Sequence, residues 1–276
     1  MQFSYLKMRG AGNRIVVVDA RDKNGPIPTP EQLIALGDEA TGPGFDQLMW
    51  VMAAASPEMA ASYRVFNADG SEVEQCGNGV RCVAWMLAQQ EGAPSVFKLD
   101  SPAGPIEVRM MSAEQFSANM GAPEFQPERI PFVADARATR YTLDVSGRNI
   151  DVAVVSMGNP HCVIQVDNPG TADVEGIGAL IEQHERFPEG CNVGFMAVRG
   201  RREIDLRVFE RGVGETLACG TGACAAMVAA RQVGMVDDRV RVNLPGGQLV
   251  VSWQDNNDAV WLTGNAEFIG EGTINL

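Results

Sequence analysis

The chain has 276 residues, which is enough for one large domain or two of ordinary size. Its 22 Lys and Arg against 35 Asp and Glu give a formal net charge of −13, which argues against a surface that binds nucleic acid. No apolar targeting segment starts the chain, and the longest apolar runs, 48–55 and 223–230, fall far short of the roughly 20 residues of a membrane span. We therefore expect a cytoplasmic protein that binds neither nucleic acid nor membrane.

In chain order, the predicted elements are mostly strands. Residues 203–208 alternate polar and apolar side chains, which is the pattern of a strand with one buried face. The other predicted strands are 15–19, 63–66, 106–110, 150–155, 162–166, 240–243, 249–253 and 260–263.

Helices are predicted at four places. The first begins after Thr29, with Pro30 in its first turn and Gln32 completing a capping box. Another is indicated by apolar residues at helical spacing between 174 and 181. The segments 80–88 and 223–230 each follow a Cys-Gly-x-Gly turn and are apolar nearly all round, which is typical of a buried helix.

A long internal repeat organises these elements. Residues 64–79 match 207–222 at seven of sixteen positions without a gap, at an offset of 143. Further matches follow at the same offset, and Gly12-Asn13 matches Gly158-Asn159 at 146. A duplication explains this order better than chance. The fold class is therefore α/β (α+β), with two pseudo-symmetric halves, each a curled sheet or barrel around a central buried helix.

Cys76 and Cys219 take equivalent places in the two copies, each at the start of a buried helix. A helix N-terminus offers unpaired N–H groups and positive potential, which lower a thiol pKa and bind a carboxylate. If the halves face each other, the two cysteines flank one cleft. One could then remove a proton from a carbon while the other returns a proton to the opposite face.

The two copies differ at positions where an asymmetric substrate would require different residues. Asn67 is matched by Glu210, and Ala68 by Arg211. Glu210 and Arg211 could bind a distal ammonium and a distal carboxylate. They could equally form a structural ion pair, and the residues alone leave both interpretations open.

The two cysteine motifs together resemble the diaminopimelate epimerase family. The segments that carry the likeness are 67–72, 75–82 and 210–223, with Gly12-Asn13, 44–48, 157–162 and 192–196 also similar. The resemblance runs nearly end to end. It implies an isomerase that interconverts LL- and meso-diaminopimelate with no cofactor and no metal, on the route to lysine and peptidoglycan.

The resemblance also implies roles for particular residues. Cys76 and Cys219 are the catalytic acid/base pair, and His161 and Glu210 tune them. The reacting-end carboxylate is held by Gly77, Asn78, Gly220 and Thr221. The remaining groups of the substrate are bound by Asn13, Gln47, Asn67, Asn159, Asn192, Glu210 and Arg211.

The family's organisation implies two domains, 1–118 plus 266–276 and 119–265, with the last strand returning to the first domain. A homodimer is expected as well. The family often carries an aromatic residue near its C-terminus at the dimer contact, and Gly270 stands there in this chain.

Other functions remain open at this point. Proline racemase-like enzymes share the two-cysteine chemistry, although the complete motif favours a diamino diacid. The cysteines could instead form a redox dithiol or a metal site. Five residues separate Cys76 from Cys82 and four separate Cys219 from Cys224, against the roughly two to four usual between zinc ligands, and the second cysteine of each pair falls inside a predicted helix. The simplest interpretation of Cys82, Cys162, Cys191 and Cys224 is that they are small buried hydrophobic residues.

Overall fold

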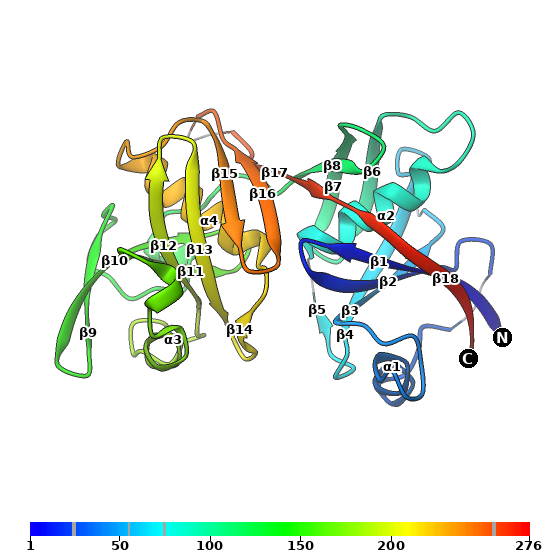
Figure 1. Cartoon of the computed structure of the whole chain (residues 1–276), viewed down its shortest axis with the longest axis horizontal. Coiled ribbons are helices and arrows are strands. Elements are labelled where there is room, and N and C mark those ends of the chain that lie inside the picture. Colours follow the sequence, from blue (N-terminus) through cyan, green and yellow to red (C-terminus); the bar gives the residue numbers. More distant parts are fainter. Residues whose placement is uncertain (24–25, 55, 74–75, 256–257) are drawn as a thin grey trace. The chain divides into compact units, whose positions relative to one another are not determined.

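A computed structural model describes residues 1–23, 26–54, 56–73, 76–255 and 258–276. The chain forms two compact units, Met1–Asn119 with Thr263–Leu276, and Met120–Leu262 (Figure 1). We call these unit 1 and unit 2. No helix in the described ranges is both long enough and apolar enough to cross a membrane. Glu74 and Gln75, which precede Cys76 in the first motif, lie outside the described residues.

Unit 1 is a curled sheet around one helix. Its central helix is α2 (Gly77–Ala88), and a shorter helix, α1 (Pro30–Gly37), lies outside the sheet. The helix α2 contacts β1, β2, β3, β7 and β8, and ten of its twelve residues are buried. The strands are β1 (Gln2–Gly10), β2 (Asn13–Asp19), β3 (Gln47–Met52), β4 (Ala61–Asn67), β5 (Glu72–Val73), β6 (Val96–Ser101), β7 (Gly104–Met110), β8 (Gln115–Asn119) and β18 (Glu267–Asn275), while β17 (Trp261–Asn265) crosses the boundary between the units.

Unit 2 repeats this plan. Its central helix is α4 (Gly220–Gln232), which contacts β10, β11, β12, β13, β15 and β16, and α3 (Val174–Glu182) is the outer helix. Its strands are β9 (Tyr141–Val145), β10 (Arg148–Ser156), β11 (Pro160–Gln165), β12 (Asn192–Gly200), β13 (Glu203–Glu210), β14 (Gly214–Thr216), β15 (Arg239–Leu244) and β16 (Gly247–Ser252). Single turns of 3-10 helix lie at Pro127–Arg129 and Pro169–Thr171.

The strand pairing shows the repeat at the level of single residues. In unit 1, β2 runs parallel to β3 and β4 runs parallel to β6, and in unit 2 the equivalent pairs β11–β12 and β13–β15 are also parallel. Ala61 on β4 lies opposite Leu99 on β6. The residues 143 positions later, Ile204 on β13 and Val242 on β15, lie opposite each other in the same way. The ion pair between Arg64 and Glu72 recurs as Arg207 with Glu215. The two units therefore share their register as well as their order of strands.

The outer helices cover separate apolar clusters. In unit 1, Leu33 of α1 packs with Phe3, Val16 and Trp50 on the sheet, and Phe3 meets Trp50 edge to face at 4.8 Å. The capping box is present, because Gln32 N–H bonds to the Thr29 hydroxyl and Thr29 N–H bonds to the Gln32 side chain. In unit 2, α3 packs on its sheet in the same way.

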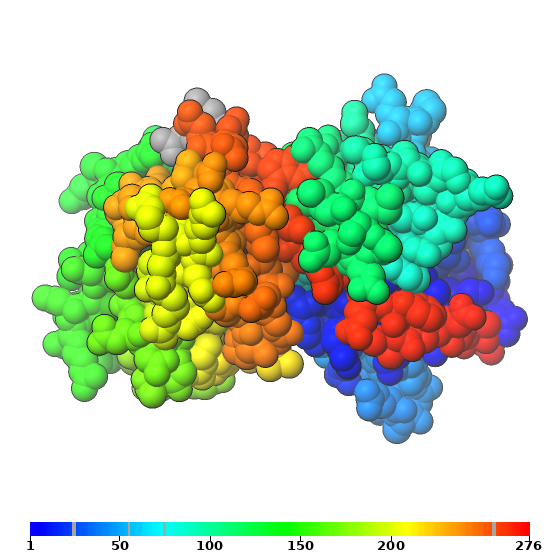
Figure 2. All heavy atoms as spheres, turned by 45° about the horizontal axis from the view of Figure 1, so that its top comes forward, coloured from blue at the N-terminus to red at the C-terminus, as the bar shows by residue number. Residues whose placement is uncertain are grey.

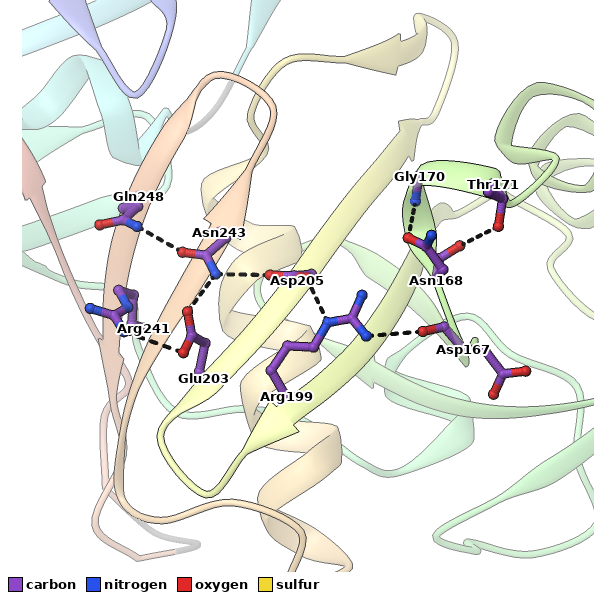
Figure 3. A network of polar contacts seen from close by, with 10 residues as sticks. All are labelled: Asp167, Asn168, Gly170, Thr171, Arg199, Glu203, Asp205, Arg241, Asn243 and Gln248. Atoms are coloured by element: carbon purple, nitrogen blue, oxygen red, sulfur yellow. Dashed lines mark hydrogen bonds and ion pairs between the residues drawn. The ribbon is translucent and has the colours of Figure 1, made fainter.

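Polar side chains line part of the sheet of unit 2 (Figure 3). Asn243 on β15 donates to Glu203 Oε1 at 3.0 Å and to Asp205 Oδ1 at 2.8 Å, both on the neighbouring β13. Asp205 also pairs with Arg199 at 2.7 Å. Hydrogen bonds from one amide to two carboxylates favour the parallel register of β13 and β15.

The predicted fold class is confirmed, and each predicted helix and strand overlaps an observed one. Several strands were not predicted, chiefly β1, β3, β6, β12 and β18. The division into two domains from a duplication stays a prediction, with unit bounds placed independently by contacts at Asn119/Met120 and Leu262/Thr263. Figure 2 shows the C-terminal strand β18, in red, on the surface of unit 1, where it pairs with β1.

Candidate active site

Cys76 and Cys219 have the same structural role: each is the N-cap of the central helix of its unit. Both have extended backbone angles, and each sulfur accepts a hydrogen bond from an N–H three residues on, Gly79 at 3.1 Å and Gly222 at 3.4 Å. The Gly-x-Gly sequence lets the helix start lie against a strand. A Cβ on Gly222 would lie 3.0 Å from Val208 Cγ2 on β13, and one on Gly79 would overlap Met49 on β3.

The first residues of each helix can bind an anion. Gly77 and Asn78 open α2, and Gly220 and Thr221 open α4. N–H groups at these positions have no carbonyl partner within their own helix, and the helix dipole adds positive potential. Each helix start therefore combines a thiol with groups suited to a carboxylate.

In unit 1, Cys76 is connected to two residues predicted to bind substrate. The half-buried Cys76 thiol donates to Gln47 Oε1 at 2.6 Å. Gln47 Nε2 donates to Asn67 Oδ1 at 3.2 Å, and Asn67 donates to Ser71 Oγ at 3.1 Å. Gln47 and Asn67 face each other across β3 and β4. These hydrogen bonds orient the Gln47 side chain so that its oxygen faces the Cys76 sulfur.

Asn13 and Asn78 also meet in unit 1. Asn13 begins β2 after a tight hairpin in which Ala11 and Gly12 both have positive φ, the conformation of a two-residue turn. The Asn78 amide donates to Asn13 Oδ1. Asn78 is 3% exposed, whereas Asn13 is only partly buried.

In unit 2, Cys219 is held in a more enclosed setting. It is 4% exposed, and its sulfur lies 3.5 Å from Thr221 Oγ1. Burial raises the pKa of the Cys219 thiol well above its ordinary value, and the nearby Glu210 carboxylate raises it further. Hydrogen bonds from Thr221 and Gly222 act in the opposite direction but are the weaker influence. The expectation of a lowered thiol pKa at this helix start is therefore wrong for Cys219, because desolvation outweighs the helix end.

His161 is buried and neutral. It is 1% exposed, and burial, with help from the positive charge of Arg211, lowers its pKa to about 3. Its Nε2 lies 3.0 Å from Asn159 Oδ1, and Asn159 Nδ2 donates to Thr221 Oγ1 at 3.4 Å. Because Asn159 Oδ1 can only accept, Nε2 carries the proton. His161 therefore reaches Cys219 through Asn159 and Thr221.

The remaining predicted residues of unit 2 also lie together. Asn192 is 4% exposed, donates to the Pro160 carbonyl at 3.1 Å and accepts from Arg211 N–H at 3.1 Å. The Arg211 guanidinium donates to the Glu189 carbonyl at 3.0 Å, and Glu210 accepts from the Thr216 hydroxyl. Glu210 and Arg211 form no ion pair within the part of the chain that the structure describes. The interpretation of these two residues as a structural ion pair is therefore wrong.

The other four cysteines are core residues, as predicted. Cys82, Cys162, Cys191 and Cys224 are all fully buried, and all six cysteines of the chain are thiols. Burial raises the pKa of Cys82 to about 12. Across the residues described, no cluster of three or more metal-ligating side chains occurs.

The predicted site residues thus form two groups, one in each unit. Around Cys76 lie Asn13, Gln47, Asn67, Gly77 and Asn78, and around Cys219 lie Asn159, His161, Asn192, Glu210, Arg211, Gly220 and Thr221. That the two groups act on one substrate stays a prediction. Sequence reasoning gave no role to Arg81, the buried arginine behind Asn78, although the first motif contains it.

Comparison with known proteins gives a family match over most of the chain. The sequence model of the family described as Diaminopimelate epimerase matches residues 5–126 and 153–269. Similar curated proteins named diaminopimelate epimerase come from Pseudomonas savastanoi pv. phaseolicola, 46% identical, and Ectopseudomonas mendocina, 43% identical. Each comparison covers 100% of both chains.

Solved structures share the fold. A hydroxyproline epimerase from Agrobacterium vitis matches with a TM-score of 0.70 at 17% identity, covering 99% of this chain and 92% of that one. A PhzF-family phenazine biosynthesis protein from Bacillus anthracis matches with a TM-score of 0.70 at 16% identity, covering 100% of both chains. At these identities the likeness establishes the fold alone.

Proposed function

Because the chain belongs to the diaminopimelate epimerase family, we propose that it interconverts LL- and meso-diaminopimelate, a reaction that serves lysine and peptidoglycan synthesis. The observation that carries this proposal is the matched pair of cysteine N-caps, Cys76 and Cys219. Epimerisation at one carbon requires removal of a proton from one face and delivery of a proton to the other. Two thiols at equivalent helix starts supply one base and one acid, so the proposal requires neither metal nor organic cofactor.

The N–H groups at each helix start also take part in the reaction, because they bind the substrate carboxylate. The reacting-end carboxylate would accept hydrogen bonds from N–H groups of Gly77, Asn78, Gly220 and Thr221. These donors favour the negative charge that develops on the carboxylate when the α-proton leaves. The same positive potential that binds the substrate therefore stabilises the carbanion.

The surroundings of the two thiols differ. Burial and Glu210 favour the neutral thiol at Cys219, which suits it to deliver a proton. Cys76 is half-buried and would act as the base for the opposite face, after releasing to solvent the proton that it donates to Gln47. The roles reverse in the opposite direction of the reaction.

Recognition of the distal end of the substrate falls to polar residues near each cysteine. Glu210 is suited to an ammonium group, and the exposed guanidinium of Arg211 to a carboxylate. Asn13, Gln47, Asn67, Asn159 and Asn192 offer amide donors and acceptors. A substrate with an amino acid at both ends matches this combination of charges.

The test is epimerisation of LL-diaminopimelate by the reduced protein with chelator present and no pyridoxal phosphate. We expect meso product from the wild type, and none from Cys76→Ala or Cys219→Ala. Cys82→Ala and Cys224→Ala are matched controls, since each removes a buried thiol from α2 or α4, and both should keep most of the activity. Turnover of L-proline in place of diaminopimelate, or equal damage from Cys82→Ala in a folded protein, would overturn the proposal.

We further propose that the protein is a cytoplasmic homodimer. A reducing compartment keeps the six cysteines as thiols. Phe268 and Ile269 on β18 are 43% and 46% exposed next to Gly270, which gives unit 1 an apolar surface for a second copy. Light scattering should give twice the chain mass of 29.6 kDa, and Ile269→Lys should reduce it to the monomer mass. A wild-type monomer at micromolar concentration would refute the dimer.

A further inference from the structure

Arg81 is a charged residue in the core of unit 1. It lies in the first turns of α2 and is 0% exposed. A buried guanidinium is costly unless its N–H groups are bonded. Arg81 Nη1 donates to the Gly77 carbonyl at 3.0 Å, and Nη2 donates to Asn78 Oδ1 at 2.8 Å. Both acceptors belong to the first two residues of the helix, directly after Cys76.

The bond to Asn78 fixes the direction of its carboxamide. An arginine side chain only donates, so the Asn78 oxygen must face Arg81 and the NH2 group must face away. That NH2 group donates to Asn13 Oδ1. Asn13, bound through its oxygen, in turn keeps its own NH2 group for a ligand. Arg81 thus sets the polarity of two amides in succession.

In the second copy, the residue equivalent to Asn78 needs no arginine to orient it. At the offset of 143, Asn78 corresponds to Thr221 and Arg81 to Cys224. A hydroxyl rotates about its C–O bond and can present its hydrogen or its lone pairs, whereas a carboxamide presents different atoms on its two sides. Threonine therefore needs no orienting donor. The amide and the arginine occur together in one copy and are absent together from the other.

Unit 2 does contain an orienting donor, but it acts on the residue equivalent to Asn13 and not on the residue equivalent to Asn78. Asn159 corresponds to Asn13, and the His161 N–H lies against its oxygen at 3.0 Å. This contact turns the Asn159 NH2 group toward Thr221 Oγ1. In both units a buried nitrogen donor thus sets the direction of an asparagine that belongs to the site.

We propose that Arg81 is a positioning residue of the epimerase, which turns the side-chain amide donor of Asn78 toward the reacting-end carboxylate of the substrate and, through Asn78, keeps the NH2 group of Asn13 available to the remaining groups of the substrate. The inference rests on the proposed function. Without Arg81 the Asn78 amide is free to flip and present its oxygen, which repels a carboxylate. Hydrogen bonds to charged groups are among the stronger ones in proteins, so KM should rise about tenfold or more.

The first test is Arg81→Ala with chemical rescue. KM for LL-diaminopimelate should rise about tenfold or more, with a smaller change in kcat per folded enzyme. Ethylguanidinium, which replaces the deleted atoms, should restore KM, whereas ethylammonium should not. Cys82→Ala, an equally buried change in the same helix, should leave KM unaltered. If Arg81→Ala does not fold, Arg81→Lys takes its place.

The second test places at positions 78 and 81 the residues that the second copy has there. In an Asn78→Thr background, Arg81→Cys should change KM by less than about twofold, because a hydroxyl requires no orientation. A purely structural role predicts the same factor whether asparagine or threonine stands at position 78. That result, or a folded Arg81→Ala enzyme with wild-type KM, would overturn the inference.

A readout without substrate separates this inference from the proposed function. The NH2 resonances of Asn78, assigned by their loss in Asn78→Thr, should exchange with solvent at least about tenfold faster in Arg81→Ala. Equal exchange overturns the inference whether or not the protein is an epimerase. Inactivity of the wild type on diaminopimelate, with fast exchange in the variant, would count only against the proposed function.

Discussion

Replacing His161 with glutamine should remove a loss of stability that the wild type suffers in mild acid. The glutamine Nε2 can take the place of the histidine Nε2 and donate to Asn159, but it never becomes charged. Burial lowers the pKa of His161 from 6.5 to about 3. The unfolded chain therefore binds a proton here that the folded chain does not, and acid favours unfolding.

The expected size follows from these two pKa values. Well above pH 6.5 neither state carries the proton, so there His161 leaves stability unchanged with pH. As pH falls from 6.5 toward 3, the unfolded state gains the proton first. Linkage then gives a loss of about 2 kcal/mol between pH 7 and pH 5. The variant lacks this contribution.

Urea denaturation at pH 7 and at pH 5 measures this loss of stability. Carboxylates contribute to the pH dependence of both proteins and cancel in the difference between them. The wild type should lose about 2 kcal/mol more than His161→Gln over this range. His184→Gln is the matched control, since it changes the other histidine of the chain. Equal losses in the wild type and His161→Gln would show that His161 is not held neutral by burial.

Three further outcomes are expected. Iodoacetamide at pH 8 should alkylate Cys76 before Cys219, because Cys219 is 4% exposed and its pKa is raised; mass spectrometry showing equal rates would contradict this. Glu210→Gln removes a negative charge beside Cys219, so alkylation of that thiol should begin at lower pH while epimerisation falls, and an unchanged pH profile would argue against the coupling. Thr29→Ala breaks the capping box of α1 and should cost about 1 kcal/mol in chemical denaturation, whereas the exposed control Glu31→Ala should cost less.

The repeat made much of the fold predictable. Identical residues at an offset of 143 indicated two similar units, and alternating segments such as 203–208 indicated their strands. The strand β3 was missed because its central residues are buried on both faces, so 48–51 form a continuous apolar run without alternation. The strand β18 was missed because most of its residues are exposed, which leaves little hydrophobic signal.

Residue types and spacing were enough to place the cysteines, but not to describe their surroundings. The helix start at Cys219 suggested a lowered pKa, yet desolvation is a tertiary effect that spacing along the chain does not encode. Likewise, the chain of hydrogen bonds from Arg81 through Asn78 to Asn13 joins, in its last step, residues 65 positions apart. The signal that could have identified Arg81 was the paired replacement of Asn78 and Arg81 by Thr221 and Cys224 in the second copy.

The most direct test of the cysteine pair is the position of the label at early conversion in D2O. A thiol carries one proton, so an acid equilibrated with solvent gives deuterium to the product, while the proton removed from the substrate stays on the other sulfur. Starting from LL-diaminopimelate, we expect the first meso product to carry one α-deuterium while the remaining LL substrate keeps its protium. Meso product that retains the original protium would mean that one group both removes and returns the proton, and would contradict the assignment of Cys76 and Cys219 as an acid/base pair.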